Sequence, residues 1–287
     1  FKPREYQNLI INQILDKPRT AIWAGMGMGK TSSTLTALET MYLAGESRPT
    51  LVLAPLRVCN STWPEEAHKW AHLTEIDVQP VTGDEKNRLA ALKRDASIYA
   101  CNYQNIPWLV DHYGAHWPFG TVVADESTRL KSFRLRQGGV RAQALAKVAH
   151  KNVKRFINLT GTPAPNGLQD LWGQTWFLDA GQRLGRTYSA FTDRWFCRTA
   201  DGFGRELRSQ SAADEIYNKL RDICLTIEAR DWFDLNEPIV KEIEVEMPRS
   251  ARRLYDQLKK DLILQIEQHT ITAANAAVKT QKLLQMA

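Results

Sequence analysis

Short apolar runs, each bounded by turn residues, alternate with helix-like stretches through residues 1–160 of the chain. A run that is apolar on both faces is typical of a strand buried in a parallel sheet, because helices cover such a sheet on both sides. The alternation predicts an α/β fold, a parallel sheet with helices on both faces. The predicted strands are Thr20–Ala24, Thr50–Ala54, Ser97–Cys101, Thr121–Ala124 and Arg155–Leu159, and the predicted helices between them include Thr31–Leu43, Thr62–His72 and Asp84–Asp95.

The pattern changes beyond this region. From residue 166 to 236 the strand pattern stops, and a composition rich in Trp, Phe, Arg and helix formers predicts a small helical subdomain. Polar and apolar residues then alternate over Ile239–Met247, which predicts one strand, and leucines at four-residue steps predict a helix over Ser250–Gln268. The predicted domains are therefore 1–165, 166–236 and 237–287.

A glycine-rich run, Ala24-Gly25-Met26-Gly27-Met28-Gly29-Lys30-Thr31, follows the first predicted strand and opens a helix. Glycines let backbone amides converge on phosphate oxygens, and the helix N-terminus adds its positive dipole end. Lys30 is placed to reach the β- and γ-phosphates, and the Thr31 hydroxyl to bind magnesium. The run predicts a nucleotide site with ATP and Mg²⁺ as ligands.

Two adjacent carboxylates, Asp125 and Glu126, follow the predicted strand Thr121–Ala124. An acidic residue at the end of a buried strand needs a cation or a hydrogen-bond partner. In an enzyme with a phosphate loop, that cation is the magnesium held by Asp125. Glu126 is then placed to orient or deprotonate the attacking water. Lys30, Asp125 and Glu126 are the predicted catalytic residues.

Positive charge is concentrated in one stretch of the chain. The whole sequence has 38 Lys and Arg against 32 Asp and Glu, a net charge of +6. Between Glu126 and Asp170 there is no acidic residue, so this stretch carries +9 and the remainder 6 − 9 = −3. A cluster of charges of one sign favours contact with a polyanionic partner over the alternative of a helix whose basic face is only solvated. Its members are Arg129, Lys131, Arg134, Arg136, Arg141, Lys147, Lys151, Lys154 and Arg155.

One long segment carries a family resemblance. Leu159-Thr160-Gly161-Thr162-Pro163, followed by Asn166 and by Leu171-Trp172, resembles the third motif of Swi/Snf-type ATPases in helicase superfamily two. Other motifs follow in the order of that family, and the resemblance covers nearly the whole chain. They are Arg4 with Tyr6 and Gln7, Ala24–Thr31, Leu53–Leu56 with Trp63–Glu66 and Trp70, Tyr99–Tyr103, and Asp125–Lys131.

The resemblance implies a RecA-like motor lobe at 1–165, a helical insertion at 166–236 and the beginning of a second motor lobe at 237–287. It also implies residue roles. Arg4 and Gln7 would read adenine, with Gly25, Gly27 and Gly29 in the phosphate loop, and Thr160 and Thr162 would couple nucleotide state to DNA grip. The implied DNA contacts are Arg57 and Tyr103, beside Lys131, Arg134 and Arg136 of the basic stretch.

The sequence departs from the family at Ser127 and Thr128, where Ala and His are usual. The family also has paired arginines that reach the nucleotide from the second lobe, and this sequence has no candidate for them before Ala287. We therefore expect the second lobe to follow Ala287, and residues 1–287 alone to bind ATP but hydrolyse it poorly.

The leading hypothesis is an ATP-dependent translocase or helicase-like ATPase on double-stranded DNA. The alternatives are a nucleotide-gated DNA-binding module without motor activity, an RNA-directed ATPase, and a small-molecule kinase with a phosphate loop, against which the Gly-Thr-Pro segment counts. No window approaches the roughly 20 apolar residues of a membrane span, so no membrane partner is expected. The absence of long insertions favours a bacterial or viral origin and a cytoplasmic location, or a nuclear one in a eukaryote.

Overall fold

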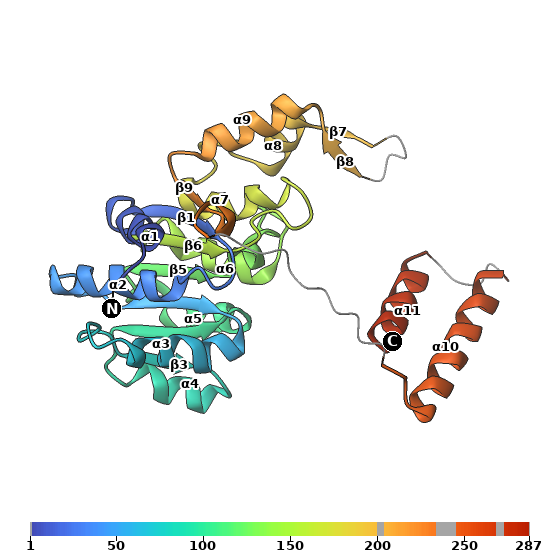
Figure 1. Cartoon of the computed structure of the whole chain (residues 1–287), viewed down its shortest axis with the longest axis horizontal. Helices are drawn as coiled ribbons and strands as arrows, with labels where there is room; N and C mark the ends of the chain where they lie inside the picture. Colours follow the sequence, from blue (N-terminus) through green and yellow to red (C-terminus); the bar gives the residue numbers. More distant parts are fainter. Residues whose placement is uncertain (1, 200–203, 234–244, 268–272, 287) are drawn as a thin grey trace. The chain divides into compact units, whose positions relative to one another are not determined.

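The computed structural model describes residues 2–199, 204–233, 245–267 and 273–286. The chain divides into two compact units, Phe1–Leu235 and Asn236–Ala287. The first unit contains a seven-stranded sheet in the order β3-β4-β2-β5-β6-β1-β9 (Figure 1). All neighbouring strands in this sheet run parallel, which confirms the predicted α/β class. The strands are β1 (Arg19–Ala24), β2 (Thr50–Ala54), β3 (Val78–Val81), β4 (Ile98–Asn102), β5 (Thr121–Asp125), β6 (Arg155–Thr160) and β9 (Cys224–Ile227).

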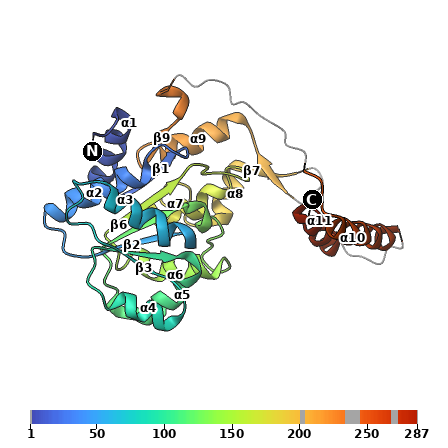
Figure 2. The ribbon, with the colours of Figure 1, turned by 60° about the horizontal axis from the view of Figure 1, so that its bottom comes forward.

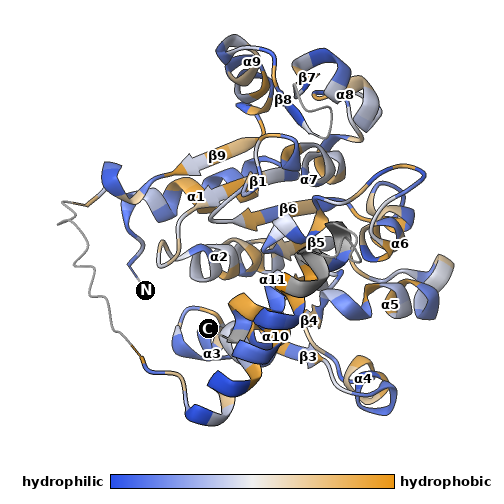
Figure 3. Ribbon diagram, turned by 90° about the vertical axis from the view of Figure 1, so that its right-hand side faces the viewer, coloured by the Kyte–Doolittle hydropathy of each residue, from blue (hydrophilic) through white to orange (hydrophobic). Residues whose placement is uncertain are grey.

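Helices cover the sheet on both faces, and the apolar runs of the strands explain why. Alternate residues of β1 enter different cores: Ala21 and Trp23 join one apolar cluster, and Ile22 and Ala24 join the other. Figure 3 shows the hydrophobic colour along β1, β6 and β9. The second cluster contains apolar residues of α1 (Glu5–Asp16), α2 (Lys30–Leu43) and α3 (Trp63–Lys69), and the first contains those of α4 (Glu85–Leu92), α5 (Ile106–Tyr113), α6 (Val140–Ala149) and α7 (Asp170–Asp179).

The region from residue 166 onward differs from its prediction as a helical segment without strands. It contains α7, α8 (Tyr188–Trp195) and α9 (Gln210–Leu220), which Figure 2 labels. It also contains a hairpin of β7 (Phe196–Arg198) and β8 (Arg205–Leu207) (Figure 1). The chain then returns to the main sheet as β9, which pairs in parallel with β1. A four-residue strand at a sheet edge leaves too short a pattern to be recognised from the sequence.

Strand β3 was not predicted either. It contains Pro80, which cannot donate a ladder hydrogen bond and so argues against a central strand. In the structure β3 is the edge strand beside β4, the position where a proline is tolerated.

The second unit contains two helices, α10 (Arg249–Glu267) and α11 (Ala273–Met286), which lie side by side. Helix α10 agrees within a residue at each end with the helix predicted over Ser250–Gln268. Most of the strand predicted over Ile239–Met247 lies outside the described residues. No helix in the described part of the chain has the length and apolar character that a membrane span requires.

Candidate functional site

The phosphate loop connects β1 to α2, as the sequence predicts. Gly27 (φ 76°) and Gly29 (φ 68°) adopt the left-handed conformation that glycine accepts without strain. Lys30 Nζ donates to the carbonyl oxygens of Ala24 (2.7 Å) and Gly25 (2.9 Å), so the ammonium lies over its own loop. Burial lowers the pKa of Lys30, while the nearby carboxylates Asp125 and Glu126 raise it. A phosphate group would therefore offer this ammonium a stronger, charged acceptor at the place where it already lies.

Gln7 of α1 is held against the same loop. Its Oε1 accepts a hydrogen bond from the Arg4 backbone N at 2.9 Å, which caps α1. Its Nε2 lies so close to Gly29 that a Cβ on that glycine would approach it to 2.1 Å. The structure thus brings the predicted adenine-reading residue and the phosphate loop into contact.

One cavity of ≈ 720 Å³ joins the parts of this site. Of the predicted nucleotide-binding residues, Gly25 does not line this cavity. Phe233, which follows β9, was not predicted from the sequence as a site residue. The Arg4 guanidinium carbon lies 4.9 Å from the centre of the Phe233 ring. The cavity is lined by Arg4, Tyr6, Gln7, Gly27, Gly29, Lys30, Thr31, Ser32, Thr62, Glu66, Lys69, Trp70 and Phe233.

Gly29→Ala is expected to lower ATP affinity by about tenfold or more, equivalent to about 1.4 kcal/mol. An alanine there combines the strain of the left-handed backbone with displacement of Gln7. Gly45→Ala is the matched control, because Gly45 also has a positive φ (96°) but has no atom near its Cβ position. Both variants should lose thermal stability in a melting experiment, but only Gly29→Ala should lose ATP affinity in a titration. Equal affinities for the two variants would contradict the role of the Gln7–Gly29 contact.

Asp125 ends β5 beside a tryptophan from a distant helix. Its Oδ2 accepts a hydrogen bond from Trp63 Nε1 at 2.9 Å, and Trp63 is fully buried at the start of α3. Burial raises the pKa of Asp125, while the Trp63 hydrogen bond and the charge of Lys30 lower it. The sequence placed Trp63 in a family motif, but its contact with the carboxylate appears only in the structure.

Glu126 has φ 62° and ψ 56°, an uncommon conformation for a residue with a side chain. Its Oε1 accepts hydrogen bonds from the hydroxyls of Thr128 (3.0 Å) and Thr160 (3.3 Å). Thr160 Oγ1 in turn accepts from the Thr162 backbone N at 3.1 Å. The two predicted coupling residues therefore form a chain of hydrogen bonds that begins at Glu126: Thr160 donates to Glu126, and Thr162 donates to Thr160. Thr128, at the position where the family usually has His, also donates to Glu126.

The donor set suits magnesium. The Thr31 hydroxyl and the Asp125 carboxylate are hard oxygen ligands, and Mg²⁺ is usually bound by one or two carboxylates together with substrate phosphates and water. Within the described ranges, no group of three or more His, Cys, Asp or Glu side chains could form an all-protein metal cage. Thr31 and Asp125 are thus the residues that would hold the ion.

The predicted DNA-contact residues have different environments. Arg57, after β2, and Arg136 are exposed. Lys131 forms an ion pair with Asp170 at 3.1 Å. The Arg134 guanidinium lies 3.4 Å from the centre of the Tyr188 ring and donates to two backbone carbonyl oxygens.

Tyr103 requires a correction. Its side chain is only 1% exposed, and its hydroxyl donates to the Asp125 carbonyl oxygen at 2.9 Å. Burial also raises the pKa of Tyr103 well above the usual range of a tyrosine. This side chain packs against the end of β5 and is too buried to contact a DNA backbone.

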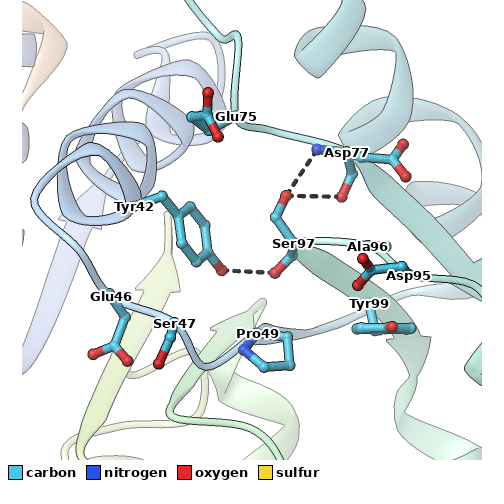
Figure 4. A pocket seen from close by; sticks show the side chains of 10 residues that line it. All are labelled: Tyr42, Glu46, Ser47, Pro49, Glu75, Asp77, Asp95, Ala96, Ser97 and Tyr99. Carbon is cyan, nitrogen blue, oxygen red and sulfur yellow. Dashed lines mark hydrogen bonds between the residues drawn. The ribbon is translucent and has the colours of Figure 1, made fainter.

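A second cavity, of ≈ 420 Å³, lies before the first residues of β2, β3 and β4 (Figure 4). Its lining includes four carboxylates, Glu46, Glu75, Asp77 and Asp95. Ligands of parallel α/β sheets bind outside the carboxyl ends of the strands, whereas this cavity is at the opposite edge. Its negative charge also disfavours a polyphosphate, so the phosphate loop remains the candidate nucleotide site.

Comparison with known proteins gives the following relatives. The family model of the SNF2-related domain matches residues 19–286. "Putative protein p41" of Acyrthosiphon pisum secondary endosymbiont phage 1 is 58% identical over 292 residues, which cover 100% of this chain and 64% of that protein. "Helicase SWR1" of Yarrowia lipolytica is 26% identical over 255 residues, 82% of this chain and 13% of that protein. The chain therefore spans less than two thirds of these relatives.

Among solved structures, the Sulfolobus solfataricus SWI2/SNF2 ATPase core in complex with dsDNA aligns with a TM-score of 0.64. The alignment covers 100% of this chain and 58% of that one, at 22% sequence identity. At this identity the match establishes a shared fold.

Proposed function

Since the chain belongs to the SNF2-related domain family, we propose that it forms the ATP-binding part of a motor that translocates on double-stranded DNA. The observation that carries the proposal is the contact between Glu126 and Thr160. It joins Glu126, which follows β5, to Thr160 at the end of β6, and the phosphate loop follows β1 in the same sheet. These are the segments that a nucleotide-driven motor has to connect.

In this proposal Lys30 leaves its two carbonyl acceptors to hold the β- and γ-phosphates, while Arg4 and Gln7 face the base. Magnesium, held by Thr31 and Asp125, would supply positive charge to the phosphate oxygens. Glu126 orients the attacking water and accepts its proton. Its hydrogen bonds from Thr128 and Thr160 then change, and Thr162 carries that change into the loop.

The test is ATP hydrolysis by the full-length protein with and without duplex DNA, followed by triplex-displacement and strand-displacement assays. Stimulation by duplex DNA together with triplex displacement supports a translocase. ATP-dependent DNA binding without turnover would favour a nucleotide-gated binding module, and stimulation by RNA alone an RNA-directed ATPase. The phage relative supports a viral or bacterial origin for this chain.

Arg136→Ala is expected to weaken duplex-DNA binding and to reduce the salt slope of log affinity by about one unit, as expected for one lost phosphate contact. Arg136 is exposed in the basic stretch, whereas Lys131 and Arg134 already contact protein groups. Arg221→Ala, an exposed arginine outside that stretch, is the control. Fluorescence anisotropy titrations at several salt concentrations measure both slopes. An unchanged slope for Arg136→Ala would remove this residue from the proposed DNA contacts.

A further inference from the structure

The side chain of Gln174 connects two segments of the candidate site without lining its cavity. It projects from α7 and is 4% exposed. Its Oε1 accepts a hydrogen bond from Ser127 Oγ at 2.8 Å, and its Nε2 donates to the Pro163 carbonyl oxygen at 2.7 Å. Ser127 directly follows Glu126, and Pro163 directly follows Thr162. One amide thus joins the segment after β5 to the loop after β6.

The bridge is buried and its polar atoms are paired. Ser127 is 0% exposed. Gln174 Nε2 also donates to the backbone carbonyl oxygen of Asp170 at 3.0 Å. The backbone carbonyl oxygen of Gln174 accepts a hydrogen bond from Asn158 Nδ2 at 3.0 Å. A buried polar group that loses its hydrogen-bond partner destabilises the folded state. These hydrogen bonds therefore keep one arrangement unless both segments move together.

Helix α7 also contacts both segments at other points. A Cβ on Gly173 would lie 2.5 Å from the Lys131 carbonyl oxygen, so the helix is seated directly on the backbone that follows Ser127. The Asp170 carboxylate pairs with Lys131 at 3.1 Å and accepts from the Asn166 backbone N at 3.0 Å. Lys131 belongs to the first segment and Asn166 follows the second, so Asp170 repeats the connection made by Gln174.

We propose that Gln174 is a positioning residue that couples the Asp125–Glu126 segment to the Thr160–Pro163 loop. The strained backbone of Glu126 persists only if its surroundings hold it, and the Ser127 hydrogen bond is one of the contacts that do so. A change at Glu126 is then transmitted to Pro163 through the amide, in parallel with the direct Thr160 contact. This inference rests on the proposed function, because it presupposes a motor in which nucleotide state changes DNA affinity.

The experiment compares Gln174→Leu and Ser127→Ala with the wild type in the full-length protein. Duplex-DNA affinity is measured with a non-hydrolysable ATP analogue and with ADP, and the ratio of the two affinities reports the coupling. We expect each variant to reduce that ratio by about fivefold or more, the lower end of typical allosteric coupling. Thr192→Val is the control, since Thr192 is 0% exposed and its hydroxyl donates to the Ser189 backbone carbonyl oxygen within α8, a hydrogen bond that includes no residue of either segment.

The double variant Ser127→Ala/Gln174→Leu should reduce the ratio no further than either single variant, because both remove the same bridge. Single variants that retain the wild-type ratio, as Thr192→Val should, would overturn the inference and leave the proposed function intact. A wild-type protein whose DNA affinity ignores the nucleotide would overturn both. If Gln174→Leu does not fold, the ratio for Ser127→Ala decides.

Discussion

Glu126→Gln is expected to lower ATP turnover by about 10²–10⁴-fold, the usual contribution of a positioned general base. The amide cannot accept a proton from water, but its oxygen can still accept the hydrogen bonds of Thr128 and Thr160. ATP affinity should therefore persist while the chemical step is lost. Single-turnover hydrolysis and a separate Mg-ATP titration on the full-length protein distinguish these two effects.

Glu85→Gln is the matched control, because Glu85 is an exposed carboxylate of α4 outside the nucleotide cavity. Its turnover should equal that of the wild type. If Glu126→Gln retained turnover close to the control, Glu126 would not be the general base, and the proposed hydrolytic mechanism would be wrong.

Lys30→Ala is expected to abolish ATP binding at ordinary assay concentrations. Hydrogen bonds to charged groups contribute about 1.5–3 kcal/mol each, so losing two phosphate contacts should weaken binding by about 100-fold or more. The change also removes the positive charge that lowers the pKa of Asp125, so the pKa that burial already raises should rise further. Isothermal titration with Mg-ATP measures the loss directly.

The control for this variant is Lys86→Ala, which removes an exposed lysine of α4. It should bind Mg-ATP as the wild type does, and both variants should melt cooperatively. Tight Mg-ATP binding by Lys30→Ala would count against the phosphate loop as the nucleotide site.

Much of the fold could be predicted because its strands are buried on both faces. Such strands leave continuous apolar runs, and the five predicted runs lie within one residue of β1, β2, β4, β5 and β6 at each end. Strands β3 and β9 were missed because both lie at sheet edges, where short length and Pro80 weaken the pattern. The order of the strands is not encoded in any local pattern, since parallel neighbours are joined through helices and need not be consecutive.

The site shows the same division. Gly29, Lys30 and Glu126 could be predicted as site residues from the sequence because each belongs to a short motif whose spacing reflects local chemistry, and their roles stay predictions. Tyr103 could not be placed correctly, because a tyrosine after a strand can turn either to the surface or to the core. Its burial depends on the neighbouring end of β5, which is distant in sequence.

The sequence by itself determined the α/β class, the phosphate loop, the acidic pair and the Thr-Gly-Thr-Pro segment, because these depend on residues close together in the chain. The tertiary structure alone decided that Trp63 holds Asp125, that Gln7 contacts Gly29 and that Gln174 joins Ser127 to Pro163. Each of these contacts joins residues far apart in the sequence. They form only when the strand order brings the carboxyl ends of β1, β5 and β6 to one edge and the helices bury the side chains between them.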